Sequence, residues 1–376
     1  ITLLDQTDLV FVDPVGTGYS EAIKPHRNDN FLSVMPDAEM VRDFVTSYVN
    51  RYNRQNSPKY LYGESYSGIR IPIAARMLVE AGTANFLANP AGGKPIVLSG
   101  LVLNSPILDY GANCDKNAAA SCAGYQPTYD FVADYHQKST ARGQAGFSDY
   151  AGVARTFADT DFSTALQAYR QTTKDAFAAT ASGKRVLDRL QDLTGVAAAN
   201  WQADLNMHPA TFKRALMPGW NLGRYDARTK LPVGGSYLPD DFDSKAFPAA
   251  LATLLPDFVN YRNKTTYTAG GISWNRDGWK STTDLLQVLM LDPALKVLIV
   301  HGYHDTATPF HQSELDLKAA LLQDRVPVKV FEGGHMIYYT EDSRAPLRKA
   351  LEDFYRAPPY SYDPVTAGGP PSTLSQ

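Results

Sequence analysis

Short apolar runs alternate with segments of helical spacing at both ends of this chain, and this alternation narrows the possible folds more than any other feature. The apolar runs are predicted to be buried strands at residues 8–13, 59–62, 96–104, 296–300 and 327–331. The intervening segments are predicted to be helices at residues 36–52, 69–82, 283–290, 312–322 and 344–355. Strands that alternate with helices indicate an α/β fold, with a mostly parallel sheet flanked by helices. Ligands bind beyond the carboxyl ends of such strands, so polar residues directly after each strand are the candidates for chemistry.

The α/β pattern is interrupted in the middle of the chain. Residues 110–283 are rich in alanine, aromatic residues and polar loops, without clean strand alternation. We therefore predict a largely helical inserted cap at 110–283, between two parts of an α/β core at 1–109 and 284–356. The tail at 357–376 holds Pro-Pro and Gly-Gly pairs without apolar periodicity and is predicted to be disordered.

Charge and hydropathy argue against two kinds of partner. The 376 residues include 36 Lys and Arg against 39 Asp and Glu, a net charge of −3, and no long basic stripe. Nucleic acid is therefore not an expected partner. The longest apolar run, near residues 285–300, is broken by Asp292, Pro293 and Lys296, so no membrane span is predicted.

The chain has two cysteines, Cys114 and Cys122, separated by seven residues. Their spacing permits a disulfide that closes a small loop, and it does not match a zinc ribbon or a redox pair. A disulfide would favour an oxidising compartment. Because the sequence starts at Ile1 without a methionine, we expect any signal peptide to lie upstream.

The segment KYLYGESYSGIRIPIAARML places a serine at a sharp transition from a strand to a helix. A nucleophile on such a turn needs small residues two positions before and two positions after it. For Ser65 these neighbours are Gly63 and Ser67, whereas for Ser67 they would be Ser65 and the branched Ile69. Ser65 is therefore the predicted nucleophile. The alternative is that GESYSG only opens a helix, since serine is a common cap.

Two polar residues that follow later strands complete a possible triad. A serine hydroxyl is activated when an imidazole takes its proton and a carboxylate orients that imidazole. Asp305 comes five residues after the strand at 296–300, and His335 comes four residues after the strand at 327–331. The order serine, acid, histidine is that of α/β hydrolases. We predict His335 as the general base and Asp305 as its orienting acid.

Two rival interpretations of the polar residues are weaker. His301, His304 and Asp305 crowd together, but they lie on a predicted loop and lack the H-E-x-x-H arrangement of a helical metal site. Gly16 and Gly18 begin a glycine-rich motif whose last position is Glu21, so the nucleotide-binding spacing fails. We therefore predict no cofactor and no metal.

Taken together, these segments resemble the serine carboxypeptidases of peptidase family S10, within the α/β-hydrolase superfamily. The resemblance lies in stretches that occur in family order: DLVFVDPVGTGYS, YLYGESYSG, GLVLNSPILD, VLIVHGYHDTATPF and EGGHM. The middle segment WNLGRYDAR is similar to the bacterial branch. The resemblance implies that Ser65, Asp305 and His335 form the triad and that the Tyr66 backbone N–H is one oxyanion-hole donor. It also implies a peptide substrate with a free C-terminal carboxylate and a periplasmic or secreted location.

The resemblance gives roles to two further residues. In these enzymes the glutamate before the nucleophile helps to hold the terminal carboxylate, which requires a buried acid that stays protonated. Glu64 would take this role, and an acidic pH optimum would follow. Met336 would line the pocket for the leaving residue. The alternatives are that Glu64 only forms a salt bridge and that Met336 only packs.

One family segment has no counterpart in the sequence. The family carries W-N-G-G-P-G upstream of the strand at residues 8–13, where it supplies the other oxyanion amide and further carboxylate ligands. We therefore expect that the sequence is truncated at its N-terminus. Two other functions stay open: an esterase or acyltransferase with the same triad, and a non-catalytic binding protein. The sequence does not indicate the oligomeric state or the preferred substrate side chains.

Overall fold

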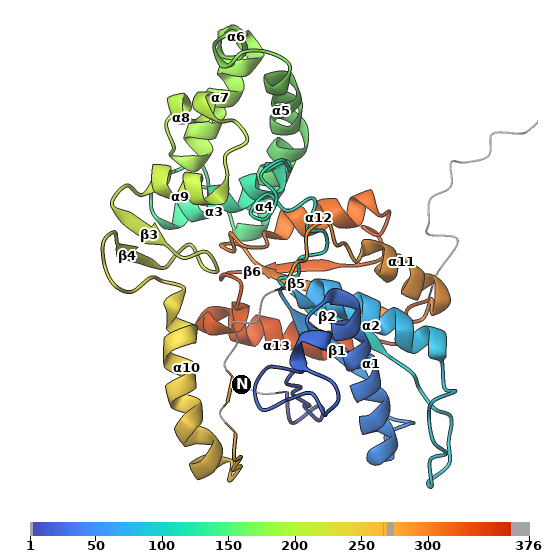
Figure 1. The fold of residues 1–376 in the computed structure, drawn as a ribbon. Coiled ribbons are helices and arrows are strands. Elements are labelled where there is room, and N and C mark those ends of the chain that lie inside the picture. Colours follow the sequence, from blue (N-terminus) through green and yellow to red (C-terminus); the bar gives the residue numbers. More distant parts are fainter. Residues whose placement is uncertain (1–2, 266, 269–273, 362–376) are drawn as a thin grey trace, which may run out of the picture.

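The computed structural model describes residues 3–265, 267–268 and 274–361. At its centre lies a four-stranded sheet in the order β1-β2-β5-β6 (Figure 1). Its strands are β1 (Tyr60–Glu64), β2 (Gly100–Asn104), β5 (Lys296–Gly302) and β6 (Val328–Phe331). Each strand pairs in parallel with its neighbour. The two central strands, β2 and β5, are buried along their whole length, which explains the apolar runs at residues 101–103 and 297–300.

Helices cover both faces of this sheet. They are α1 (Val34–Arg51), α2 (Ser67–Ala81), α11 (Thr282–Leu291), α12 (Phe310–Ala319) and α13 (Glu341–Arg356). Leu103 and Ile299 pack in one cluster with residues of α2, α11 and α12. Val102 and Val300 pack in another cluster with residues of α13. Successive strand residues therefore face opposite layers, as the pleat requires.

A group of helices lies above the sheet in Figure 1. Its helices are α3 (Gln126–Tyr135), α4 (Phe147–Phe157), α5 (Ser163–Arg170), α6 (Lys174–Ala179), α7 (Ala181–Thr194), α8 (Ala198–Ala203) and α9 (Pro209–Leu216). Tyr129 and Phe212 stack at its centre with their ring centroids 4.0 Å apart. Tyr303 and Phe310, which follow β5, belong to the same apolar cluster. The helical group is therefore packed directly on the loop that carries Asp305.

The chain returns from this group through a short hairpin and a long helix. The hairpin pairs β3 (Trp220–Leu222) with β4 (Lys230–Pro232) in antiparallel fashion. The helix is α10 (Asp241–Thr253), followed by a π-helical turn at Leu254–Phe258. The hairpin was not expected, because three-residue strands leave too short a pattern to recognise in the sequence.

The α/β fold is confirmed, but the predicted strand at residues 8–13 is wrong. Residues 8–12 lie beside β1, line the same cavity of about 450 Å³, and form no strand. Phe11 is 91% exposed. No main-chain hydrogen bond joins this stretch to β1 in the described part of the chain. Apolar composition is not sufficient for a strand, because the backbone also needs a hydrogen-bonded neighbour.

The other predicted boundaries of strands and of the tail lie closer to those of the structure. The strand expected at 96–104 begins only at Gly100, because Ile96–Ser99 forms no ladder with a neighbouring strand. The division into core and cap at residues 110 and 283 stays a prediction. The tail expected from residue 357 is described as far as 361, and there the Tyr360 N–H donates to Ala294 O at 3.0 Å. Residues 362–376 lie outside the described residues. Every helix of the described ranges is too short or too polar to cross a bilayer.

Candidate active site

Ser65 lies on the turn between β1 and α2. Its φ of 58° is in the left-handed region, which residues with a side chain seldom adopt. The turn is tight at Gly63, where a Cβ would lie 2.5 Å from the Cβ of Ser67. The Ser65 N–H donates to Asn104 O at 3.0 Å, and Ser65 O accepts from the Ile107 N–H at 3.1 Å. The strained turn is therefore fixed to the end of β2, as expected of a nucleophile elbow.

Asp305 and His335 contact each other directly. His335 Nδ1 lies 2.7 Å from Asp305 Oδ2, and both side chains are buried. Asp305 Oδ1 accepts hydrogen bonds from the N–H groups of Ala307 and Thr308 at 2.8 and 3.1 Å. Burial alone would lower the pKa of His335, but the charge of Asp305 and its hydrogen bond outweigh burial and raise it. The pair thus has the geometry of an oriented imidazole.

The loops of Ser65 and His335 meet at the end of β2. The Ser105 hydroxyl donates to His335 O at 2.8 Å, next to Asn104, which anchors Ser65. His335 Nε2 is buried and has no hydrogen-bond partner among the described residues. Because Nδ1 faces Asp305, Nε2 is the nitrogen left to accept a proton. The fold thus brings the ends of β1, β5 and β6 to the same edge of the sheet.

Glu64 lies beside the pair in a partly buried position. Asn104 Nδ2 and the Tyr338 hydroxyl both donate to Glu64 Oε2, at 2.9 and 3.0 Å. Asn104 Nδ2 also lies 3.2 Å from His335 O. Burial raises the pKa of Glu64, and the nearby His335 charge and the two hydrogen bonds lower it by less. A Glu64 carboxyl with a raised pKa keeps its proton to higher pH than an ordinary glutamate does.

Tyr66 follows Ser65, and its side chain is turned toward α1. Its hydroxyl donates to Asp37 Oδ2 at 3.0 Å, and the guanidinium groups of Arg70 and Arg276 lie 5.1 and 4.6 Å from the centre of its ring. No backbone carbonyl of the described residues accepts the Tyr66 N–H, so this donor is available to a ligand. Met336 directly follows His335 and is partly buried.

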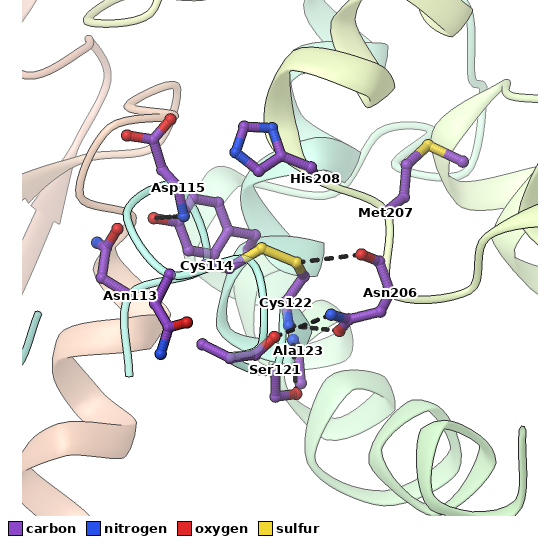
Figure 2. Close-up of a disulfide and its surroundings, with 12 residues drawn as sticks. Asn113, Cys114, Asp115, Ser121, Cys122, Ala123, Asn206, Met207 and His208 are labelled. Atoms are coloured by element: carbon purple, nitrogen blue, oxygen red, sulfur yellow. Dashed lines mark hydrogen bonds between the residues drawn. A yellow bond between two sulfur atoms is a disulfide. The ribbon is translucent and has the colours of Figure 1, made fainter. Parts of the chain in front are cut away.

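Cys114 and Cys122 form a disulfide with Cα atoms 5.2 Å apart (Figure 2). The Cys122 N–H donates to Asn206 Oδ1 at 2.8 Å, and Asn206 Nδ2 donates to Ala120 O at 2.8 Å. The bridge therefore closes a loop that is pinned to the segment before α9.

The histidines near Asp305 have structural contacts. His301 Nε2 lies 2.9 Å from Ser313 Oγ, and burial lowers the pKa of His301 to about 4. Burial lowers the pKa of His304 to about 3. Within the described ranges, no three His, Cys, Asp or Glu side chains are placed to hold a metal ion.

Sequence reasoning missed four residues that support the site. Asn104 and Tyr338 contact Glu64, while Ser105 contacts the His335 loop. The Thr308 hydroxyl lies 2.8 Å from Asp305 Oδ2 and 3.1 Å from His335 Nδ1. Asn104 gave a usable signal, because a polar residue ends an otherwise apolar strand and so faces the ligand edge of the sheet. Ser105 and Tyr338 gave none, because their contacts join distant parts of the chain. Thr308 is only three residues from Asp305, but nothing in the sequence pattern marks its hydroxyl as a contact of the pair.

The parallel sheet, its helical layers and the placement of Ser65, Asp305 and His335 at the strand ends are those of an α/β hydrolase. The family described as serine carboxypeptidase, Peptidase S10, matches residues 4–332, and the chain belongs to this family. It is thus a serine-type carboxypeptidase, a hydrolase that acts on peptides. The match ends just before His335, so the assignment of this base rests on its contact with Asp305. No curated protein matched the chain.

Proposed function

We propose that the chain releases residues from the C-termini of peptides through an acyl-enzyme on Ser65. The observation that carries this proposal is the buried 2.7 Å contact between His335 Nδ1 and Asp305 Oδ2, at the sheet edge where Ser65 lies. Asp305 accepts a hydrogen bond from the Nδ1–H group of His335 and so leaves Nε2 as the basic nitrogen. His335 then takes the Ser65 proton as the hydroxyl attacks the scissile carbonyl, and returns it to the leaving amine. Water hydrolyses the acyl-enzyme by the same proton transfers.

The oxyanion of this reaction would be held in part by the Tyr66 backbone N–H. This donor follows the nucleophile directly, as in other nucleophile elbows, and has no backbone acceptor in the described part of the chain. Loss of a single oxyanion donor typically slows an enzyme about 100- to 1,000-fold.

Glu64 would select substrates with a free C-terminal carboxylate. Both of its described hydrogen bonds end on Oε2, which leaves Oε1 for a proton. A protonated Oε1 donates to a substrate carboxylate, whereas an ionised Glu64 repels it. Activity on free C-termini would therefore be highest at acidic pH. Met336, next to His335, would contribute apolar surface to the pocket for the leaving residue.

A periplasmic or secreted location would follow from the same reasoning. The Cys114–Cys122 bridge persists in oxidising compartments and is rare where thiols are kept reduced. Fractionation of cells that express the full-length gene would test this location.

A matched pair of substrates tests the function. Full-length protein is incubated with a blocked dipeptide and with its C-terminally amidated analogue, and release of the last residue is followed from about pH 4 to pH 8. We expect cleavage of the free acid and little cleavage of the amide, with a preference that falls as pH rises. Equal cleavage of both substrates would exclude selection by Glu64. Failure of a fluorophosphonate to label Ser65 would exclude the serine mechanism itself.

A further inference from the structure

Two consecutive residues, Arg224 and Tyr225, contact the loops of both Asp305 and His335. Arg224 O accepts a hydrogen bond from Thr306 Oγ1 at 2.8 Å, and Thr306 directly follows Asp305. Tyr225 O accepts from the His335 N–H at 2.7 Å, and the Tyr225 ring lies 5.1 Å from the imidazole. Adjacent carbonyls of one segment therefore hold the acid loop and the base loop relative to each other.

Residues 224–226 pack so closely against the loop that carries His335 that neither segment can move without the other. A Cβ at Gly334 would lie 2.4 Å from Tyr225 O and 2.5 Å from the Cβ of Asp226. The two backbones are thus in direct contact at the residue before His335. A displacement of residues 224–226 would be passed on to the imidazole, because packed atoms leave no free space between them.

The Arg224 side chain anchors this segment to Asp115. Arg224 Nη2 and Nε lie 2.6 and 3.0 Å from Asp115 Oδ2. The two side chains are only 29% and 10% exposed. The carboxylate of Asp240 accepts the backbone N–H of Arg224 at 2.9 Å. Arg224 is therefore fixed at both its main chain and its guanidinium, and removal of Asp115 would leave a largely desolvated cation.

Asp115 belongs to the loop that the disulfide closes. It follows Cys114, while Asn206 holds the other end of the loop at Cys122 (Figure 2). The Asp115 N–H donates to the Tyr125 hydroxyl at 3.2 Å, and that hydroxyl donates to Ala307 O at 3.2 Å. Ala307 N–H in turn donates to Asp305. The bridged loop thus reaches the acid loop by two routes, through Arg224 and through Tyr125.

Building on the proposed Ser65 mechanism, we propose that Arg224 is a positioning residue for the Asp305–His335 pair, and that the disulfide-closed loop keeps it in place through Asp115. Arg224 touches neither substrate nor reacting atoms in this role. It acts through the two carbonyls that fix Thr306 and His335.

The chain offers a matched control for such an ion pair. Arg155 on α4 makes two hydrogen bonds to Glu314 on α12, at 2.7 and 2.8 Å, and these side chains are 31% and 22% exposed. The pair resembles Arg224–Asp115 in distance and burial, and it also joins the helical group to another part of the molecule. It makes no hydrogen bond to Asp305 or His335 among the described residues. Arg155→Gln therefore reports what loss of a comparable ion pair does to stability alone.

The experiment measures the rate of Ser65 labelling by a fluorophosphonate as a function of pH in full-length protein. This rate reports activation of the serine and does not depend on substrate choice. We expect Arg224→Gln and Asp115→Asn each to lower the plateau rate about 10- to 100-fold, the range for misplaced catalytic groups. Arg155→Gln should stay within about twofold of wild type, as for sites that touch no functional group.

Double variants and the pH profile of Ser65 labelling distinguish a positioning role of Arg224 from a general loss of stability. The double variant Arg224→Gln/Asp115→Asn should be no slower than the slower single variant, because both act on one path. Cys114→Ala/Cys122→Ala should lower the labelling rate by a larger factor in the wild-type background than in Arg224→Gln, where only the route through Tyr125 remains. The Arg224 charge opposes protonation of His335. The acid limb of the labelling profile should therefore move to higher pH in Arg224→Gln. It should stay in place in Arg224→Lys, which keeps the positive charge but loses the forked N–H donors of the guanidinium.

The outcomes that count against the inference differ from those that count against the mechanism. If wild-type Ser65 is not labelled, the proposed mechanism fails. If wild type is labelled and Arg224→Gln matches its rate and its acid limb, or if Arg155→Gln is equally slow, the positioning role is excluded. Circular dichroism monitors folding, and Arg224→Lys decides the question if Arg224→Gln does not fold.

Discussion

The Tyr338 hydroxyl donates a hydrogen bond to Glu64 Oε2 at 3.0 Å, from a position three residues after His335. This bond favours the ionised carboxylate and so lowers the pKa of Glu64, against the larger effect of burial. In Tyr338→Phe we expect the pKa of Glu64 to rise further. Glu64 then stays protonated to higher pH, and the alkaline limb of the kcat/KM profile for peptides with free C-termini moves to higher pH.

A pH profile of kcat/KM for Tyr338→Phe beside wild type measures this shift. Tyr52→Phe is a suitable control, because Tyr52 is exposed directly after α1 and its described ring contacts are with Tyr48 and Arg51, not with Glu64. A shift of the alkaline limb to lower pH would contradict the proposed role of protonated Glu64.

Asp305→Asn tests the acid of the pair. The Asp305 carboxylate raises the pKa of His335 and fixes Nδ1 as the protonated nitrogen. Without the charge, the pKa of His335 falls, so the acid limb of the activity profile should move to lower pH. The wrong tautomer should lower kcat about 10,000-fold, the effect known for such substitutions in serine proteases.

A second buried aspartate controls for the loss of a carboxylate. Asp130 is fully buried, accepts hydrogen bonds from Gln126, and burial raises its pKa strongly. The described hydrogen bonds of Asp130 are with Gln126 and not with Asp305 or His335, so Asp130→Asn should change kcat by less than about twofold. A comparable loss of activity in both variants would mean that Asp305 acts through stability alone.

Asp316 gives a prediction for stability. Burial raises its pKa to about 7, and its Oδ1 accepts a hydrogen bond from Gln312. Because the folded pKa exceeds the unfolded value, the folded state binds the proton more tightly, and stability falls as pH rises from about 4 to 7. Asp316→Asn should therefore have a higher Tm than wild type at pH 8 and a similar Tm at pH 4. Thermal unfolding at both pH values, with exposed Asp342→Asn as a control, measures the difference; equal Tm shifts at both values would refute it.

Local signals in the sequence were sufficient for much of the fold. The helix at α2 and the turn before it could be predicted because strand, small residues and helical spacing follow one another within about twenty residues. The strand at residues 8–13 could not be excluded, because whether an apolar run finds a pairing partner depends on the rest of the sheet.

In the candidate site, too, some residues are indicated by the sequence, whereas others are found only in the structure. Ser65, Asp305 and His335 follow strands and carry reactive groups, so chain order was informative. The contacts of Tyr225 with His335 and of Arg224 with Asp115 join residues more than a hundred positions apart, and no periodicity announces them. Such contacts depend on tertiary packing and require coordinates.

The backbone of Ser65 gives a further prediction. At φ 58° a residue with a Cβ is strained by about 1–2 kcal/mol, whereas glycine is not. Ser65→Ala and Ser65→Gly should both be inactive, but Ser65→Gly should be more stable than Ser65→Ala by about 1 kcal/mol, opposite to the usual order of these residues. Urea unfolding of the two variants decides this, and a more stable alanine variant would argue against strain at the turn.

At this turn, the stability of the fold and the reactivity of the site make opposite demands on residue 65. The side chain that the chemistry requires stands where the backbone tolerates it least, so the molecule should become sturdier when it loses its nucleophile. Selection for heat resistance alone would then favour Ser65→Gly and yield inert protein. Thermostable forms of this enzyme should therefore be sought with turnover as a second criterion, and stabilising changes are best placed away from the turn between β1 and α2.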